Sequence, residues 1–265
     1  MSRLQDRVAV VTGSSSGNGR AIALALAAEG ARVVCSDIRR EARQGGYHTD
    51  PDIATDDLIR QHGGQATYIP ANAGDYASVE ALVQAAVGGL GRLDVMVNNA
   101  GIFTGLHTIV EETEEQYDQT MAINGKSVWL GSKFAIRQML TQDPINGSRG
   151  RIVNIASIGG LVGLPQEPAY CAAKGAVVNL TRQLALDFAP ERININAVCP
   201  GILATAMLRP YLDNTRVNKW LHAQSPWPEL GTAEDVAKAV TFLSTDESRW
   251  ATGTLLTVDG GFTSR

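Results

Sequence analysis

The stretch Val8-Ala9-Val10-Val11-Thr12-Gly13-Ser14-Ser15-Ser16-Gly17-Asn18-Gly19 decides the fold of this chain. Its apolar first five residues are typical of a buried strand, and a helical pattern begins at Arg20, directly after the glycines. Glycines between a strand and a helix allow a tight turn, and they let the backbone approach a pyrophosphate that rests on the helix N-terminus. The spacing is G-x-x-x-G-x-G and not the usual G-x-G-x-x-G, so an ordinary loop remains an alternative.

The alternation of strand and helix continues to the end of the chain. Short apolar runs predict strands at 8–12, 32–36, 66–70, 93–98, 151–156, 193–199 and 254–258. Amphipathic stretches predict helices at 20–29, 53–61, 78–87, 114–140, 169–188 and 233–243. Nearly continuous apolar strands separated by helices indicate a parallel sheet with helices on both faces. We therefore expect an α/β fold in a single domain that spans residues 1–265.

Two segments are longer than the usual loops of such a domain. Residues 40–57 are polar and rich in glycine and aspartate, and residues 203–230 carry two tryptophans and three prolines without a strand. Long segments of this kind often act as lids, and we expect 203–230 to be a substrate lid. For 40–57 a surface loop is the simpler expectation.

The composition excludes several classes of partner. The chain has 265 residues, 44% of them hydrophobic, with a net charge of −4, and no run of basic residues is longer than Arg39-Arg40. A nucleic-acid face is therefore not expected. Its three cysteines lack the pattern of a disulfide framework or a metal site. No apolar run resembles a signal peptide or a membrane span, so we expect a cytoplasmic protein with no membrane, nucleic-acid or metal partner.

A carboxylate ends the second expected strand. Asp37 lies about twenty residues beyond the glycines, where a carboxylate hydrogen-bonds the adenosine ribose hydroxyls of a dinucleotide and repels a 2′-phosphate. Arg39 and Arg40 would favour NADP, but they lie further along the chain. We therefore favour NAD over NADP, with a turn role for Asp37 as the alternative.

Tyr170 and Lys174 form a candidate catalytic pair. They are four residues apart in a segment with a helical pattern, so their side chains share a face. A nearby ammonium lowers the pKa of a tyrosine from its ordinary value of about 10. Such a phenol can give or take a proton while a hydride moves to or from a nicotinamide. The spacing by itself is common, and a surface pair is the alternative.

Six pieces of the chain together resemble the short-chain dehydrogenase/reductase family over essentially the full length. They are the glycine turn 12–19, Asn98-Asn99-Ala100-Gly101 after the fourth strand, Asn124, Ser157, Tyr170-Cys171-Ala172-Ala173-Lys174, and Pro200-Gly201 with Thr205. The resemblance implies a doubly wound, Rossmann-like sheet of about seven strands with the cofactor at the switch point of the strand order. It also implies a homotetramer in which the helices at 114–140 and 169–188 pair between subunits.

The resemblance assigns roles to four catalytic residues. Tyr170 would be the general acid/base, and Ser157 would hydrogen-bond the substrate oxygen and stabilise charge that develops on it. Lys174 would bind the nicotinamide ribose, and Asn124 would hold a water that links Lys174 to solvent. From the residues alone, Ser157 as a helix cap and Asn124 as a buried residue bonded to backbone remain open.

Cofactor and substrate contacts are implied in the same way. The expected cofactor residues are Gly13, Ser15, Ser16, Gly17, Asn18, Gly19, Asp37, Ile38, Asn72, Ala73, Asn99, Ala100, Gly101, Tyr170, Lys174, Leu203 and Thr205. Asn18 and Asn72 depart from the family pattern, although their amides can still contact a phosphate, a ribose or adenine. The expected substrate residues are Ser157, Gln166, Glu167 and Tyr170. Gln166 and Glu167 would read hydroxyl groups, with a solvent-facing polar helix as the alternative.

Together these expectations describe an NAD-dependent oxidoreductase. It would interconvert a secondary alcohol (a sugar, a polyol or another hydroxy compound) and its ketone or lactone by hydride transfer. One alternative is an NAD(P)H-dependent ketoreductase such as a 3-oxoacyl reductase. Another is a catalytically idle regulator that only binds the cofactor. Such a regulator is expected to lack the tyrosine, the lysine or the glycines, and all of them are present here.

Overall fold

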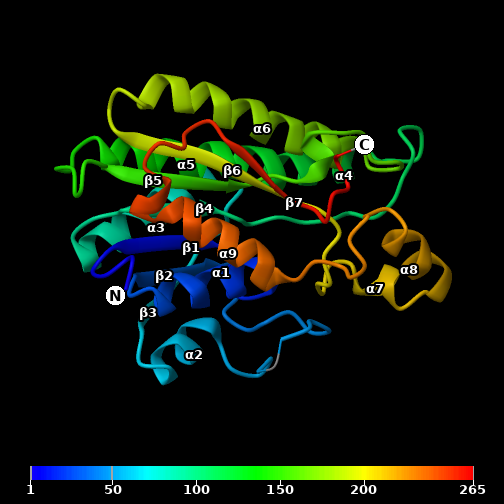
Figure 1. Cartoon of the computed structure of the whole chain (residues 1–265), viewed down its shortest axis with the longest axis horizontal. Helices are drawn as coiled ribbons and strands as arrows, with labels where there is room; N and C mark the ends of the chain where they lie inside the picture. Colours follow the sequence, from blue (N-terminus) through cyan, green and yellow to red (C-terminus); the bar gives the residue numbers. More distant parts are fainter. Residues whose placement is uncertain (1, 49, 265) are drawn as a thin grey trace.

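Seven parallel strands form one sheet in the computed structural model, which describes residues 2–48 and 50–264 (Figure 1). The strands are β1 (Val8–Thr12), β2 (Arg32–Asp37), β3 (Gln65–Pro70), β4 (Val95–Asn98), β5 (Gly150–Ile155), β6 (Ile193–Pro200) and β7 (Leu255–Val258). Their order across the sheet is β3-β2-β1-β4-β5-β6-β7, and every neighbouring pair is parallel. This is the doubly wound arrangement that the sequence predicts.

Helices cover both faces of the sheet (Figure 1). On one face lie α1 (Gly17–Ala28) and α9 (Ala233–Ser244), and on the other lie α3 (Tyr76–Leu90), α5 (Ser127–Met139) and α6 (Pro168–Phe188); α2 (Thr55–Gln61) packs against β3 and α1. Alternate residues of β1 supply both layers, because Ala9 and Val11 pack with α1 and α9 whereas Val10 packs with α3 and α5. Burial on both faces explains why the strands are apolar almost without interruption.

The strand order reverses between β1 and β4, and this reversal determines where the site lies. β2 and β3 extend the sheet on one side of β1, and β4 to β7 extend it on the other. The loops that follow β1 and β4 therefore diverge and leave a crevice at the carboxyl edge of the sheet, the usual ligand position in this architecture. The glycine turn, Asn99 and Ser157 follow β1, β4 and β5 at this edge.

The helix predicted over 114–140 contains a wider turn. α4 (Glu114–Thr120) passes into a π-helical turn (Met121–Lys126) and then into α5. The hydroxyl of Ser127 donates to the carbonyl of Ile123, and the side chain of Asn124 bonds outside the helix, so local polar contacts accompany the irregularity. Hydrophobic periodicity cannot reveal a single π-helical turn inside a long helix. Capping boxes satisfy the first N–H groups of α4 and α9.

The two inserted segments touch each other near this edge. Segment 203–230 contains two short helices, α7 (Arg209–Leu212) and α8 (Thr215–His222), which lie beyond the sheet at the right of Figure 1. Arg209 donates to the carbonyl of Gly45 at 3.0 Å, and its guanidinium lies 5.5 Å from the ring centre of Tyr47. The short helix α7 is therefore tied to segment 40–57.

All three cysteines are free thiols, and Cys35 and Cys199 are buried. Within residues 2–48 and 50–264, no group of three or more histidine, cysteine, aspartate or glutamate side chains is arranged to hold a metal ion. Over the same residues, no helix combines the length and the apolar character that crossing a bilayer requires.

Candidate active site

A cavity of about 1280 Å³ lies at the carboxyl edge of the sheet and extends from the glycine turn to Tyr170. Most of the predicted site residues line it, namely Gly13, Ser15, Ser16, Gly17, Asn18, Asp37, Ile38, Asn72, Ala73, Asn99, Ala100, Gly101, Asn124, Ser157, Glu167, Tyr170, Lys174, Leu203 and Thr205. Two predicted residues lie outside it, because Gly19 is buried behind the turn and Gln166 is exposed. The structure thus joins residues from distant parts of the chain in one continuous space.

Asn99 holds the glycine turn in shape. Gly13 has a φ of +66°, a conformation that favours glycine, and a Cβ on Gly19 would lie 2.0 Å from the carbonyl oxygen of Gly13. The Asn99 amide donates to the carbonyls of Thr12 at 2.8 Å and of Gly13 at 3.2 Å. The N–H of Asn99 donates to the Thr12 hydroxyl at 3.0 Å. Gly19 is therefore required by the shape of the turn, and its direct contact with the cofactor stays a prediction.

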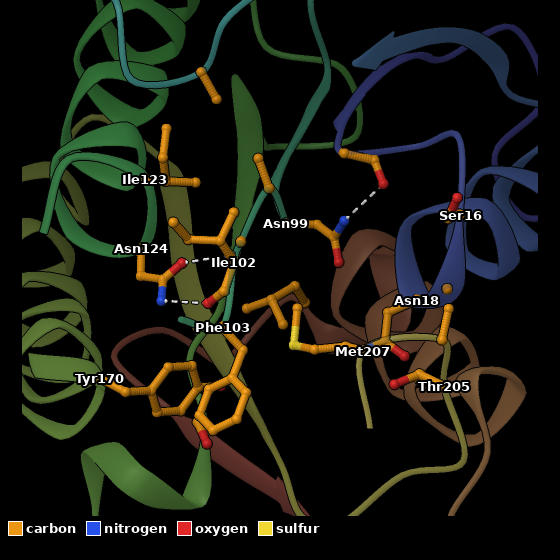
Figure 2. Close-up of a pocket in the computed structure, with 18 of the residues that line it drawn as sticks. Ser16, Asn18, Asn99, Ile102, Phe103, Ile123, Asn124, Tyr170, Thr205 and Met207 are labelled. Atoms are coloured by element: carbon orange, nitrogen blue, oxygen red, sulfur yellow. Dashed lines mark hydrogen bonds between the residues drawn. The ribbon is translucent and has the colours of Figure 1, made fainter. Parts of the chain in front are cut away.

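The turn and the start of α1 fit the diphosphate of a dinucleotide. α1 begins at Gly17, and Ser16 before it makes no side-chain cap bond, so the helix dipole and the next N–H groups of the first turn face the cavity edge. The side-chain oxygen of Asn18 is buried and has no hydrogen-bond partner among the described residues. Figure 2 shows Asn18 on the side of the cavity that holds Thr205 and Met207, away from Tyr170. An orphaned acceptor suits a ribose hydroxyl or an amide N–H and not a phosphate oxygen.

Asp37 lies at the end of β2, beside the glycine turn. Its carboxylate accepts from the N–H of Ser15 at 3.2 Å and from the N–H of Ile38 at 2.8 Å. Arg40 forms ion pairs at 2.8 Å with two aspartates of α2, whereas Arg39 lines the cavity. Of the two arginines that would favour NADP, Arg40 is therefore held away by α2.

The inserted segment 40–57 contributes a residue that sequence analysis missed. The N–H of Gly17 donates to Nε2 of His48 at 3.0 Å, and the N–H of Arg43 donates to the hydroxyl of Ser16. Burial, helped by the nearby Arg20, lowers the pKa of His48 below its ordinary 6.5, so the ring acts as a neutral acceptor at pH 7. The segment is a largely exposed loop, as expected, and it also lies against the phosphate turn. A lone histidine in a polar loop offers no sequence signal for this contact.

Tyr170 and Lys174 lie one turn apart on α6, next to Ser157 after β5. Nζ of Lys174 donates to the carbonyl of Ile155 at 2.7 Å and lies 5.8 Å from the ring centre of Tyr170. The Ser157 hydroxyl accepts from the N–H of Gly159 at 3.1 Å and lies close enough to the Tyr170 hydroxyl to lower the pKa of the phenol. Ser157 is therefore both the cap of a short helical turn and the neighbour of the phenol.

Burial decides the pKa of both members of this pair. It raises the pKa of Tyr170 to about 12, although the hydrogen bond with Ser157 acts in the opposite direction. It also lowers the pKa of Lys174 to about 8. Burial therefore dominates the pKa of Tyr170 in the protein alone, where the Lys174 ammonium is directed to the Ile155 carbonyl. The lowering of this pKa by Lys174 stays a prediction.

Asn124 is fully buried, and its amide pairs with a single residue. Its Oδ1 accepts from the N–H of Ile102 at 2.8 Å, and its Nδ2 donates to the carbonyl of Ile102 at 2.9 Å (Figure 2). These two bonds connect the π-helical turn to the irregular segment that follows Gly101. The side chain thus bonds backbone, the alternative that the sequence left open, and the water relay through Asn124 stays a prediction.

Phe103 forms the wall opposite the catalytic tyrosine, and sequence analysis missed it. Its ring meets the Tyr170 ring edge-on, with centres 5.9 Å apart and planes at 90° (Figure 2). On its other side it meets Tyr211 of α7, again with centres 5.9 Å apart. Phe103 lies in an irregular segment after the Asn-Asn-Ala-Gly motif, where no periodicity marks a lining residue. Through it, α7 reaches the catalytic tyrosine.

The two residues expected to read substrate hydroxyls have different surroundings. Glu167 lines the cavity, and burial raises the pKa of its carboxyl to about 7. Gln166 is exposed, has a φ of +62°, and accepts from the N–H of His107 through its carbonyl. The assignment of Gln166 as a substrate contact is therefore corrected, because its side chain does not line the cavity.

Similarity to known proteins identifies the family. A family profile described as enoyl-(acyl carrier protein) reductase matches residues 13–263. A short-chain dehydrogenase/reductase of Hericium erinaceus is 37% identical over 259 residues, 96% of this chain and 96% of that protein. The chain belongs to the short-chain dehydrogenase/reductase family. It is therefore an NAD(P)-dependent oxidoreductase that acts on CH–OH donors, and the expectation of an enzyme is confirmed.

Two further relatives of this short-chain dehydrogenase/reductase are named for their activities. The 2-(R)-hydroxypropyl-CoM dehydrogenase of Xanthobacter autotrophicus is 38% identical over 260 residues, 97% of this chain and 99% of that one. The cyclopentanol dehydrogenase of a Comamonas strain is 36% identical over 264 residues, with both chains covered fully. Both relatives are alcohol dehydrogenases by name.

Solved structures of the family superimpose over nearly the whole chain. A putative short-chain dehydrogenase/reductase from Burkholderia xenovorans has a TM-score of 0.86 and 35% identity, covering 100% of this chain and 99% of that one. A putative 2-deoxy-D-gluconate 3-dehydrogenase from Agrobacterium tumefaciens, with bound NADP, has a TM-score of 0.85 and 34% identity, covering 99% and 98%. A nicotinamide dinucleotide is thus the cofactor of this fold.

Proposed function

We propose that this enzyme interconverts a secondary alcohol and its ketone, with Tyr170 as the general acid/base. The observation that carries the proposal is the pairing of Tyr170 with Ser157 at one end of the cavity, with Lys174 one helical turn away. Three groups that can bind an oxygen and move its proton thus meet where an apolar wall begins at Phe103. The two relatives are named as dehydrogenases of hydroxyl compounds, and this supports the same reaction class.

The residues of this chain supply the proton chemistry. The nicotinamide, when bound, accepts or supplies the hydride. In the direction of oxidation, Tyr170 acts in its phenolate form, after its own proton has left to solvent, and takes the proton of the substrate hydroxyl while the carbinol C–H bond breaks. Ser157 donates a hydrogen bond to the same oxygen. In reduction the Tyr170 proton goes to the carbonyl oxygen, which Ser157 stabilises as negative charge develops on it.

Lys174 is placed to support Tyr170 in both directions. Its pKa of about 8 leaves it largely protonated at pH 7, so a buried positive charge lies over the phenol ring. A negative phenolate that forms during turnover is stabilised by that charge. We propose that Lys174 also binds the nicotinamide ribose. We propose that Asn124 holds in place the segment that carries Phe103, through its two hydrogen bonds to the Ile102 backbone.

NAD is the proposed cofactor, because the Asp37 carboxylate faces the cavity where the adenosine ribose of a dinucleotide belongs. The NADP bound to the Agrobacterium tumefaciens structure and the cavity-lining Arg39 support the opposite choice. Titration of the enzyme with NADH and NADPH compares the two. Tighter binding of NADH supports the proposal, and tighter binding of NADPH overturns it. Asp37→Ser is expected to move the preference towards NADPH.

The mechanism is tested by Tyr170→Phe, which removes the acid/base hydroxyl and keeps the ring against Phe103. Turnover is expected to fall by about a hundredfold or more, the scale of general acid/base catalysis, with NADH affinity retained. Tyr117→Phe on the exposed side of α4 is the matched control and is expected to leave turnover unchanged. Near-normal turnover in Tyr170→Phe would contradict the mechanism.

Two further assignments concern the parts around the site. Segment 203–230 is proposed as the substrate lid, because its Met207, Leu208 and Leu221 line the cavity and Tyr211 packs on Phe103. A homotetramer is proposed from the apolar groove between α6 and the π-helical turn that joins α4 to α5, where Trp129 is 42% exposed. Light scattering measures the assembly, and a monomer at micromolar concentration contradicts this part of the proposal.

A further inference from the structure

The carboxyl group of Glu167 has an unusual position at the start of α6. Glu167 occupies the N-cap position, where a carboxylate ordinarily accepts from the first N–H groups of the helix. It makes no such bond, and the helix that follows it begins with Pro168. Its backbone carbonyl still accepts from the N–H of Cys171 at 2.9 Å, so the chain is helical while the side chain lines the cavity.

No described residue satisfies this carboxyl. Among residues 2–48 and 50–264, no hydrogen-bond donor and no cation pairs with the Glu167 side chain. Burial is the single cause that raises its pKa, to about 7, and its charge acts on the neighbouring Tyr170 and Cys171. The Glu167 side chain is half-buried and opens to the cavity, so a bound ligand can supply the partner that the described residues do not.

The walls around Glu167 are apolar. Leu164 and Tyr170 close the cavity here, because a Cβ placed on Gly159 would lie 3.1 Å from Leu164 Cδ1 and 3.4 Å from Tyr170 Cδ1. Phe103 stands edge-on to Tyr170, and Met207 from the lid segment lines the same cavity. A substrate held at Tyr170 therefore meets apolar side chains close to the Glu167 carboxyl.

We infer that the substrate is a largely apolar secondary alcohol with one further hydroxyl group, and that Glu167 binds this second hydroxyl and so sets specificity. The inference rests on the proposed function and deepens it. A hydroxyl both donates and accepts, so it can pair with the carboxyl in either protonation state. A carboxylate or phosphate on the substrate is repelled by the ionised carboxyl, and a bare hydrocarbon leaves the carboxyl unpaired.

Cyclohexanol and the cyclohexane-1,2-, 1,3- and 1,4-diols test this inference with NAD, because they share one ring and differ in the second hydroxyl. The parent enzyme is expected to show a kcat/KM for its best diol at least about tenfold above that for cyclohexanol, mainly through KM. Glu167→Leu is expected to lower this ratio by about tenfold to a hundredfold. Glu167→Gln should retain most of it, because the amide oxygen also accepts a hydrogen bond.

Glu191→Gln, an exposed carboxyl just after the same helix, is the matched control and should leave the ratio unchanged. NADH titration and thermal melting show that each Glu167 variant is folded. The inference is overturned if Glu167→Leu keeps the parent ratio, if none of these cyclic alcohols is turned over, or if 2-aminocyclohexanol or 2-hydroxycyclohexane carboxylate is preferred to every diol. Tyr170→Phe separates the two proposals, since turnover that depends on Tyr170 with an unchanged ratio rejects only the role of Glu167.

Discussion

Replacing Lys174 with methionine is expected to change how the stability of the enzyme depends on pH. Lys174 is 4% exposed, and its ammonium donates to the Ile155 carbonyl at 2.7 Å. Methionine fills a similar volume, but it neither carries a charge nor takes up a proton. The difference in unfolding free energy between the two proteins therefore isolates the titration of this one side chain.

The sign and the size follow from the pKa of Lys174. Burial lowers it from 10.5 to about 8 in the folded protein, so between these two pH values the unfolded chain binds more protons than the folded chain. Stability contributed by Lys174 is then at its lowest below pH 8 and rises with pH until about 10.5. The two pKa values differ by about 2.5 units, and one unit corresponds to about 1.4 kcal/mol. The total rise in the free energy of unfolding is therefore about 3 kcal/mol.

Urea unfolding at pH 7.5, 9 and 10.5, at one protein concentration, measures this difference. Tyr170, Cys35 and Cys199, whose pKa values burial raises, also titrate at high pH, but they are present in both proteins. Lys219→Met on the exposed side of α8 is the control and should follow the parent at every pH. Parallel curves for the parent and Lys174→Met, within about 0.5 kcal/mol, would refute the reasoning.

Three further substitutions test the structure at other points. Gly19→Ala places a Cβ 2.0 Å from the Gly13 carbonyl oxygen, so the turn must shift. Titration should then show that the affinity for NADH is at least about tenfold weaker. An unchanged affinity counts against the role of the turn. Asn154→Leu removes one hydrogen bond each from the buried side chains of Asn98 and Thr181 and should cost about 2 kcal/mol in urea unfolding. A loss under about 1 kcal/mol contradicts this. Arg209→Ala removes the contacts of α7 with segment 40–57 and should increase the rate of NADH dissociation by about threefold to tenfold in stopped-flow fluorescence. An unchanged rate argues against a role for α7 in closing the site.

Local pattern was sufficient to predict the architecture. β1 is apolar throughout because alternate side chains enter two different helix layers, and this double burial is visible in the sequence as an unbroken run. The glycine turn was equally visible, since Gly13 needs a positive φ that few other residues adopt. Tyr170 and Lys174 were placed correctly on one helical face because their spacing is local.

Features that depend on distant parts of the chain could not be read in this way. The contact of His48 with Gly17 joins a polar loop to the phosphate turn. Phe103 contacts Tyr170, which lies 67 residues further along the chain (170 − 103). The π-helical turn at Asn124 interrupts a helix whose hydrophobic period is unbroken. In each case the partner is supplied by another element, so no local window contains the signal.

The sequence by itself determined the sheet, the order of its elements along the chain, the glycine turn and the shared helical face of Tyr170 and Lys174, because each depends on residues that are close in the chain. Tertiary structure alone decided the chemistry of that pair. Burial, and not the neighbouring ammonium, dominates the pKa of Tyr170, and the same burial leaves Glu167 without a partner in an apolar cavity. Desolvation is a property of everything packed around a group, and that surrounding exists only once the chain has folded.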